Sequence, residues 1–249
     1  MNTGIFLSVR EKATRLPGKV LLALGDANVT EGLVRRLKGS KRAGMVAIAT
    51  SDDPRDEVLC RIACAEGVKC FRGHQDDKLV RYRDAARHYG LEFVVIVDGD
   101  DPFVSVSHID RIIDHATRHD CDFVVFGGLP LGATGFGVSL RALEKVCRDK
   151  SETNTEVWGH MMTRDPALRC TELTEADPAL QRPDVRMTLD YAEDYAFCRT
   201  VTDGLAALGL DTSFENVMLW LERHPEAVEI NRGVAARYEQ HIAKSRQAS

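Results

Sequence analysis

Positive charge is concentrated in a short stretch near the N-terminus. The cations are Arg10, Lys12, Arg15 and Lys19, and they directly follow a mostly apolar run at residues 5–9. A run of this kind is typical of a buried parallel strand, and open α/β sheets bind ligands in the loops that leave such strands. A charged run is also typical of a solvated surface loop, so charge alone leaves two interpretations open. The chemical interpretation is a loop that binds a nucleoside triphosphate.

Carboxylates lie at the ends of two later predicted strands. Asp100 lies just beyond the apolar run at residues 93–97, and Asp190 ends the predicted strand at residues 186–190. Since the carboxyl ends of parallel strands meet at one edge of a sheet, we expect both carboxylates to face the basic loop. Mg²⁺ prefers one or two carboxylates together with phosphate oxygens. Cations opposite two such carboxylates are the components of phosphoryl and nucleotidyl transfer, in which catalysis consists mostly of positioning and charge stabilisation.

Strands and helices alternate along the first half of the chain. Hydrophobic patterns predict strands at residues 5–9, 45–49, 68–71, 93–97 and 123–126. Helices are predicted between them: one over residues 29–38, one that starts with Asp53 as N-cap, one that ends near His88, and one capped by Ser107 with Asp110 completing a capping box. This alternation predicts an α/β fold with a doubly wound, mostly parallel sheet.

The pattern changes after Gly127. The glycine-dense stretch 127–137 contains G-x-x-G-x-G, not the G-x-G-x-x-G of a dinucleotide-binding unit, so we discard a Rossmann interpretation. A helix is predicted from Ser139 to Asp149, the sheet is predicted to resume at residues 186–190, and another helix is predicted to begin near Ala192. Residues 213–249 are expected to be helical and partly solvated. We expect a single domain over residues 1–249, in which residues 128–182 form a small inserted lobe.

Composition narrows the class of protein. The 249 residues carry a net charge of −5, which argues against a general nucleic-acid binder, because that function needs a basic face. No apolar run approaches the roughly 18 residues of a membrane span, and the N-terminus lacks the features of a signal peptide, so we expect a cytoplasmic protein with no membrane partner. The seven cysteines lack zinc-site spacing and are predicted to be reduced thiols. His115 and His119 lie four residues apart without a third ligand nearby, which favours a solvated helix face.

Three motifs, in the right order, resemble those of a known family. Residues 10–19 resemble the R-x-x-S-T-R-L-P-G-K loop of the cytidylyltransferases that make CMP-activated sugar acids, such as the 3-deoxy-manno-octulosonate and acylneuraminate cytidylyltransferases. Residues 97–102 resemble the family's Q-G-D-x-P strand end, and residues 188–194 resemble its V-D-T-P-E-D-L segment. Four further segments bring the chain nearer to the spore-coat polysaccharide cytidylyltransferase-like branch: 49–54, 71–77, 99–103 and 219–231. The resemblance covers nearly all of residues 4–231 and is weakest between 128 and 182.

The resemblance implies a nucleotidyltransferase domain and a function for individual residues. Lys19 and Arg10 would be the catalytic cations, and Asp100 and Asp190 would hold Mg²⁺. The residues expected to bind CTP are Leu7 and Val9 through their backbone, Arg10, Thr14, Arg15, Lys19, Arg72, Gly73 and Asp77. The sequence departs from the family at Ala13, which replaces Ser and removes a hydroxyl donor, and at Tyr191-Ala192, which replaces Thr-Pro.

The acceptor is expected to bind in the region 128–182, which is also the expected contact of a homodimer. Glu156, Trp158 and His160 lie close together in the sequence and offer a carboxylate, an aromatic face and a base. A packed tryptophan with surface neighbours is an equally good interpretation of the same stretch. Pro130 and Arg186 are the other candidates for acceptor binding.

The resulting hypothesis is a Mg²⁺-dependent transfer of CMP from CTP to a small acidic acceptor such as a sugar acid, with release of pyrophosphate. A sugar phosphate or a phosphonate would also suit an arginine-rich site. A glycosyltransferase is an alternative, because Asp98-Gly99-Asp100 matches a D-x-D metal motif, but it leaves the Arg-Leu-Pro-Gly-Lys sequence without a function. A catalytically inactive nucleotide-binding regulator is a third.

Overall fold

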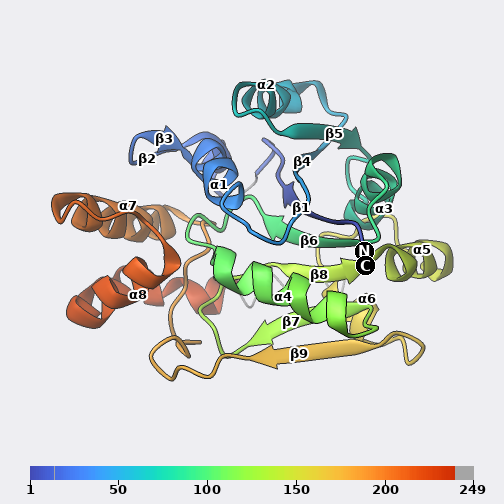
Figure 1. Cartoon of the computed structure of the whole chain (residues 1–249). Coiled ribbons are helices and arrows are strands. Elements are labelled where there is room, and N and C mark those ends of the chain that lie inside the picture. The colour runs from blue at the N-terminus through green and yellow to red at the C-terminus, as the bar shows by residue number, and fades with distance from the viewer. Residues whose placement is uncertain (14, 239–249) are drawn as a thin grey trace.

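A seven-stranded sheet crosses the centre of the computed structural model, which describes residues 1–13 and 15–238 (Figure 1). The strand order is β5-β4-β1-β6-β8-β7-β9. The strands are β1 (Thr3–Ser8), β4 (Val46–Ser51), β5 (Lys69–Gly73), β6 (Phe93–Asp98), β7 (Phe123–Gly127), β8 (Phe136–Ser139) and β9 (Cys170–Thr174). β8 pairs antiparallel with β6 and with β7, and every other pair in this sheet is parallel. The predicted α/β fold with a mostly parallel sheet is confirmed.

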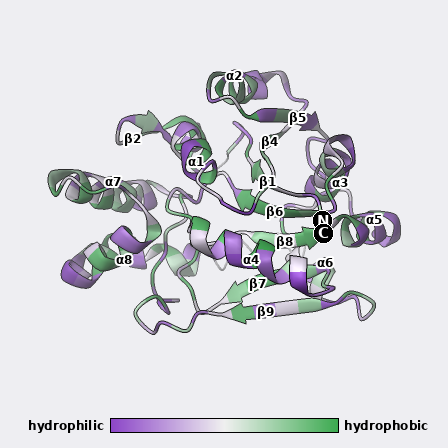
Figure 2. Cartoon of the chain, in the orientation of Figure 1, coloured by the Kyte–Doolittle hydropathy of each residue, from purple (hydrophilic) through white to green (hydrophobic). Residues whose placement is uncertain are grey.

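Helices cover both faces of the sheet because successive residues of a strand point to opposite sides. Ile5 and Leu7 of β1 pack with α1, α2 and α4, whereas Phe6 packs with α3, α5 and α6. The helices of these two layers are α1 (Val29–Leu37), α2 (Glu57–Ala65), α3 (Lys78–Tyr89), α4 (Val106–Arg118), α5 (Leu140–Asp149) and α6 (Gly159–Thr163). In Figure 2 the central strands are largely hydrophobic and the helices around them mix hydrophobic and hydrophilic residues, as a double-layered core requires.

The C-terminal part forms a third apolar cluster beside the sheet. It contains α7 (Ala192–Ala207), α8 (Phe214–Arg223), the 3-10 helix η3 (Pro225–Val228) and α9 (Glu229–Arg232). Helices α7 and α8 lie together at one side of the molecule in Figure 1. Two further 3-10 helices, η1 (Lys19–Leu21) and η2 (Pro54–Asp56), and a hairpin of β2 (Ala23–Leu24) and β3 (Ala27–Asn28) complete the described elements. Among residues 1–13 and 15–238, no helix is both long and apolar enough to cross a bilayer.

Several local predictions are confirmed, but the predicted N-cap of α4 is wrong. Asp53 caps η2, and Ser139 caps α5 through the backbone N–H of Ala142. The cap of α4 is Ser105, not Ser107, so the helix begins at Val106. Asp110 completes no capping box, because its carboxylate accepts a hydrogen bond from the Ser40 hydroxyl and another from the backbone N–H of Lys41.

The prediction of a strand at residues 186–190 is also wrong. This segment makes one isolated bridge, between Arg186 and Leu131, and then crosses the end of β6, where the backbone N–H of Leu189 donates to the carbonyl of Asp100 at 2.7 Å. The strands that complete the sheet are β8 and β9, and both lie within residues 128–182. That region therefore contributes to the main sheet as well as to the loops at its carboxyl edge.

Two glycines provide a test of the packing of the sheet. A Cβ at Gly137 of β8 would lie 2.5 Å from Ile112 Cγ2 and 2.7 Å from the Phe93 ring, both of which are buried. Gly137→Ala should therefore lower the free energy of unfolding by about 1–3 kcal/mol. Gly32→Ala is the matched control, because a Cβ there meets nothing within 4 Å and alanine favours the α1 helix, so stability should rise by about 0.5–1 kcal/mol. Urea unfolding followed by circular dichroism measures both, and equal stability of the two variants would contradict the observed packing.

Candidate active site

A polar cavity of about 570 Å³ opens at the carboxyl edge of the sheet. Its wall comes from the loops after β1 and β6, from the segments around residues 131–136 and 154–160, and from the segment that ends at Asp190. Twelve of the described residues in this wall are charged: Arg10, Lys12, Arg15, Lys19, Asp76, Lys78, Arg81, Asp98, Asp100, Asp101, Glu156 and Asp190. The basic loop and the two carboxylates thus meet at one edge of the sheet, as strand polarity requires.

Lys19 lies at the centre of this wall. Gly18 has φ +68°, a conformation in which glycine is strain-free, and it turns the chain into η1 so that Lys19 points into the cavity. The Nζ of Lys19 lies 2.5 Å from Asp100 Oδ2 and 2.8 Å from Asp190 Oδ1. Burial alone would lower the pKa of Lys19, but the carboxylates of Asp100 and Asp190 raise it above its ordinary value. The ammonium is therefore a permanent cation between two carboxylates.

Asp190 is shared by three cations. Besides Lys19, its carboxylate accepts hydrogen bonds from Arg15 and, at 2.9 Å, from Arg186 Nη2. Burial alone would raise the pKa of Asp190, but Lys19 and Arg15 lower it to about 2. Asp194 holds the segment in place, because its carboxylate accepts from Arg186 Nε at 2.9 Å and from the backbone N–H of Asp190 at 3.0 Å. Asp194 had no predicted function, although it belongs to the V-D-T-P-E-D-L-like segment.

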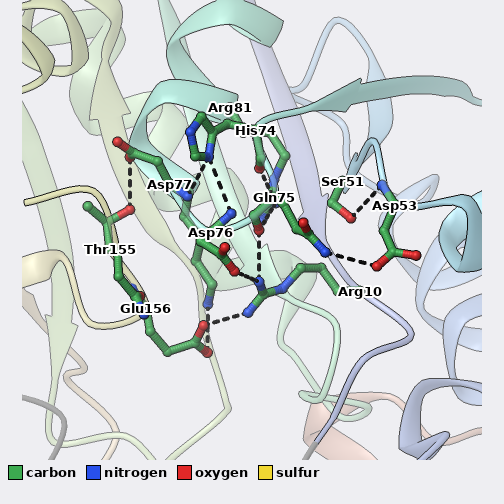
Figure 3. Close-up of polar contacts among 12 residues, drawn as sticks. Arg10, Ser51, Asp53, His74, Gln75, Asp76, Asp77, Arg81, Thr155 and Glu156 are labelled. Carbon is green, nitrogen blue, oxygen red and sulfur yellow. Dashed lines mark hydrogen bonds and ion pairs between the residues drawn. The ribbon is translucent and has the colours of Figure 1, made fainter.

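Arg10 belongs to a second group of charges, shown in Figure 3. Its Nη1 donates to the carbonyl of Gln75 at 2.8 Å, and its Nη2 lies 2.7 Å from Glu156 Oε2. Glu156 also pairs with Lys78 at 3.4 Å, and Lys78 pairs with Asp98 at 3.7 Å. Glu156 is thus a bridge between two cations.

Lys78 is a cavity residue that its sequence context did not single out. It is the first residue of α3, where a lysine is usually solvated, yet its side chain is only 12% exposed. Burial alone would lower the pKa of Lys78, but Asp98 and Glu156 raise it well above its usual range. The only signal in the sequence is its position directly after the charged loop at residues 72–77.

The predicted acceptor residues lie partly in the cavity wall. Trp158 and His160 line the cavity together with Glu156. Trp158 is 5% exposed and packs edge-on against Tyr82 and Phe136, so it is both a packed tryptophan and part of the wall. Both interpretations of this stretch therefore describe part of its environment.

Other predicted site residues lie outside the cavity wall. Arg72 pairs with Glu57 at 2.6 Å and donates to the carbonyls of Asp52 and Asp53, so it braces the loop after β4. Gly73 ends β5, and Asp77 caps α3 and pairs with Lys150. Arg72, Gly73 and Asp77 are not part of the cavity wall, and their contact with CTP stays a prediction.

The remaining predictions divide in the same way. Val9 lines the cavity, whereas Leu7 is fully buried in the core. Pro130 is buried outside the wall, and Arg186 lies behind Asp190. Thr14 falls outside the described residues.

Comparison with known proteins identifies the family. A family model described as cytidylyltransferase matches residues 5–194. The chain belongs to the cytidylyltransferase family. The predicted resemblance is confirmed, and this enzyme is a nucleotidyltransferase.

Relatives of this cytidylyltransferase share its length and fold. The spore coat polysaccharide biosynthesis protein SpsF of Bacillus subtilis is 28% identical over 237 residues, which cover 91% of this chain and 97% of SpsF. A cytidylyltransferase structure from Leptospira borgpetersenii matches with a TM-score of 0.82 at 24% identity, over 92% of this chain and 97% of that one. The structure of CMP:2-keto-3-deoxy-manno-octonic acid synthetase complexed with CTP matches with a TM-score of 0.63 at 14% identity, over 84% of this chain and 100% of that one. At these identities the two structures show that the fold is shared.

Asp190 allows a test of the charge balance in the metal-free enzyme. Asp190→Asn leaves three cations around a neutral amide and should lower the free energy of unfolding at pH 7 by about 3 kcal/mol. Because the folded pKa of about 2 lies below the unfolded value of about 3.9, this stabilisation is complete above pH 4 and is lost as the pH falls through 2. Urea unfolding in the presence of a chelator should show the difference from wild type narrowing from pH 4 downward.

The control for this test is Asp184→Asn. Asp184 pairs with Arg182 at the surface, with its side chain 50% exposed, so the change should cost no more than about 1 kcal/mol. A difference between Asp190→Asn and wild type that stays constant between pH 5 and pH 2 would contradict the low pKa of Asp190.

Proposed function

We propose that this enzyme transfers CMP from CTP to a small acidic acceptor such as a sugar acid, with Mg²⁺ as cofactor and pyrophosphate as the other product. The observation that carries the proposal is the simultaneous contact of Lys19 with Asp100 and Asp190 in a cavity that Arg10 and Arg15 of the same loop also line. Family membership supports cytidylyl transfer, and the match to a synthetase complexed with CTP supports the choice of nucleotide. The name of SpsF supports an acceptor used in polysaccharide synthesis.

The donor set at the centre of the cavity fits Mg²⁺. Asp100 and Asp190 present carboxylate oxygens to one common point, the Nζ of Lys19, and Mg²⁺ binds through one or two carboxylates plus phosphate oxygens. Burial, Asp100 and Asp98 raise the pKa of Asp101 well above its ordinary value, which disfavours the charged form of this neighbour. When bound, the ion would stabilise negative charge on the phosphate oxygens as a Lewis acid.

Lys19 and Arg15 are positioned to exchange one anionic partner for another. Both now contact Asp190, and both line the cavity in which a triphosphate would bind. An anionic phosphate can replace the carboxylate without leaving a buried cation unpaired, which would be costly. Lys19 then faces the charge that develops at the α-phosphate when an acceptor oxygen attacks.

The acceptor would meet the charges around Arg10, and region 128–182 would supply its wall. Arg10 and Lys78 share Glu156, and Trp158 and His160 lie on the same side of the cavity. Two cations near the mouth favour an acidic acceptor such as a sugar acid, a sugar phosphate or a phosphonate. A homodimer contact through the same region is part of the proposal, and sedimentation equilibrium tests it.

The glycosyltransferase alternative has less support. In a D-x-D motif both carboxylates serve one metal ion, but Asp98 pairs with Lys78 while Asp100 pairs with Lys19. The packing explains why residue 99 is a glycine, because a Cβ there would lie 2.6 Å from Val9 Cβ. The two carboxylates thus have separate partners, and the glycine allows β1 and β6 to end side by side.

Removal of either member of the central pair tests the proposal. Lys19→Ala and Asp100→Asn should each lower kcat for pyrophosphate release from CTP by at least about 10²-fold, because Lys19 would face the charge that develops at the α-phosphate and Asp100 would hold the metal ion that stabilises it. Lys12→Ala is the control within the same loop: Lys12 is exposed, and its loss should change kcat by less than about tenfold. Near-wild-type turnover in Lys19→Ala or Asp100→Asn, or release of a nucleoside diphosphate from a nucleotide sugar, would contradict the assignment.

Metal removal gives an independent test. Chelation with EDTA should abolish pyrophosphate release, and excess Mg²⁺ should restore it. The reason is that a divalent cation would link the carboxylates of Asp100 and Asp190 to the phosphate oxygens of CTP. The assay is run with each of the four nucleotides against a panel of sugar acids, sugar phosphates and phosphonates, which also identifies the acceptor. Full turnover of the chelated enzyme would contradict the proposed metal site.

A further inference from the structure

Arg15 lies close to two tyrosine rings at the edge of the cavity. Its guanidinium carbon is 5.9 Å from the ring centroid of Tyr191 and 5.9 Å from that of Tyr238. The guanidinium of Arg186 lies over the same Tyr238 ring at 4.5 Å. Distances below about 6 Å permit cation–π attraction. Both arginines also bind Asp190, so the two rings surround the cations that share this carboxylate.

The Tyr238 ring is brought to the cavity by the segment that follows α9. Val234 anchors this segment, with 1% of its surface exposed. Arg237 donates to Glu193 Oε1 at 2.5 Å, and its guanidinium lies over the Tyr191 ring at 4.8 Å. Tyr238 itself lines the cavity. Tyr191 therefore contacts both the basic loop and the C-terminal segment, at the position where the cytidylyltransferase motif has threonine.

The rings matter because the partners of Asp190 must change when substrate binds. If Asp190 turns to a metal ion and Arg15 to the triphosphate, Arg15 gives up its hydrogen bond to the carboxylate that now orients it. A ring face attracts a guanidinium without using its N–H groups, so these remain available to phosphate oxygens. The two rings can therefore hold Arg15 at the cavity throughout the exchange.

We propose that Tyr191 and Tyr238 are positioning residues that hold Arg15 for the triphosphate of the nucleotide. The inference rests on the proposed function, because it takes Arg15 to be a triphosphate ligand. The ring faces, not the hydroxyls, do this work. Burial, together with Asp190, raises the pKa of Tyr238 to about 12, so its hydroxyl stays protonated and is no base at neutral pH.

The kinetic test compares loss of the ring with loss of the hydroxyl. Tyr191→Thr, which restores the family residue, and Tyr238→Leu should each raise KM for CTP roughly five- to tenfold with kcat within about twofold of wild type. Tyr191→Phe and Tyr238→Phe should keep wild-type KM. Tyr195→Leu is the matched control: this ring lies on α7 near Arg199 and away from the cavity wall, so KM should not change. A KM that rises equally in the Phe variants, or in the control, would overturn the proposal.

A nucleotide-independent measurement separates this proposal from the proposed function. The Nε of Arg15 is buried away from solvent, so its N–H should exchange slowly and give an NMR signal, assigned by its loss in Arg15→Lys. Ring currents should shift this signal in Tyr191→Thr and Tyr238→Leu, but much less in the Phe variants.

The combined outcomes distinguish the two ideas. Shifted signals together with raised KM support the positioning role. Shifted signals with unchanged KM overturn it, since the rings then contact Arg15 without aiding nucleotide binding. An unshifted signal overturns the contact itself. A wild-type enzyme that releases no pyrophosphate from CTP contradicts the proposed function, whatever the NMR spectra show.

Discussion

The contact of Lys19 with both Asp100 and Asp190 joins three segments that lie far apart in the sequence. Ions taken out of water lose hydration, and only well-placed partners offset that loss. Around this contact the cations Arg15, Lys19 and Arg186 face the carboxylates of Asp100, Asp190 and Asp194. The balance matters for the proposed function, in which an incoming triphosphate and its metal ion would add both signs of charge. Partners can be exchanged without leaving a single buried ion uncompensated.

The fold makes this balance possible by fixing where each segment ends. β1 and β6 are parallel neighbours, so the basic loop and the Asp98–Asp101 turn leave the sheet side by side. Gly99 allows the two chains to approach closely, and its N–H donates to the carbonyl of Ser8 at 2.8 Å. The third segment carries Asp190 and Asp194. It is held by α9, where the side-chain amide of Asn231 donates to Asp194 Oδ1 at 2.9 Å. The C-terminal cluster thus positions a carboxylate of the site.

The convergence of the loops could be predicted from the sequence, because it depends only on strand polarity and on the order of apolar runs. The pairing of individual side chains could not. Arg72 has the type expected of a phosphate ligand, but Glu57 on α2 pairs with it, and nothing in the sequence specifies that contact. Lys78 is the opposite case. A lysine at the start of a helix is expected to be solvated, but the fold buries its side chain beside Asp98.

The errors in the prediction of the sheet have a similar physical origin. β9 is an edge strand of alternating exposed and half-buried residues, and β8 is four residues long with Gly137 inside it, so neither has the continuous apolar run of the central strands. In the segment 186–190 polar and apolar residue types alternate, which is typical of a strand, but its backbone hydrogen bonds are shared between Leu131 and Asp100. Apolar side chains in the sequence predict that a segment is buried. Whether the segment is a strand depends on the hydrogen-bond partners of its backbone N–H groups.

The two departures from the family motif, Ala13 and Tyr191, lie in the part of the site that must change partners. Ala13 lines the cavity without the hydroxyl that the motif has there, so the loop offers one donor fewer to a phosphate. Tyr191 adds a ring beside Arg15. Arg15 belongs to the same loop as Ala13, and its guanidinium pairs with Asp190. A hydroxyl holds a phosphate by a directional hydrogen bond, whereas a ring holds an arginine by an attraction that does not depend on which anion the arginine binds. In the proposed function, part of the binding of the triphosphate by this loop therefore moves from direct contact with the ligand to the support of Arg15.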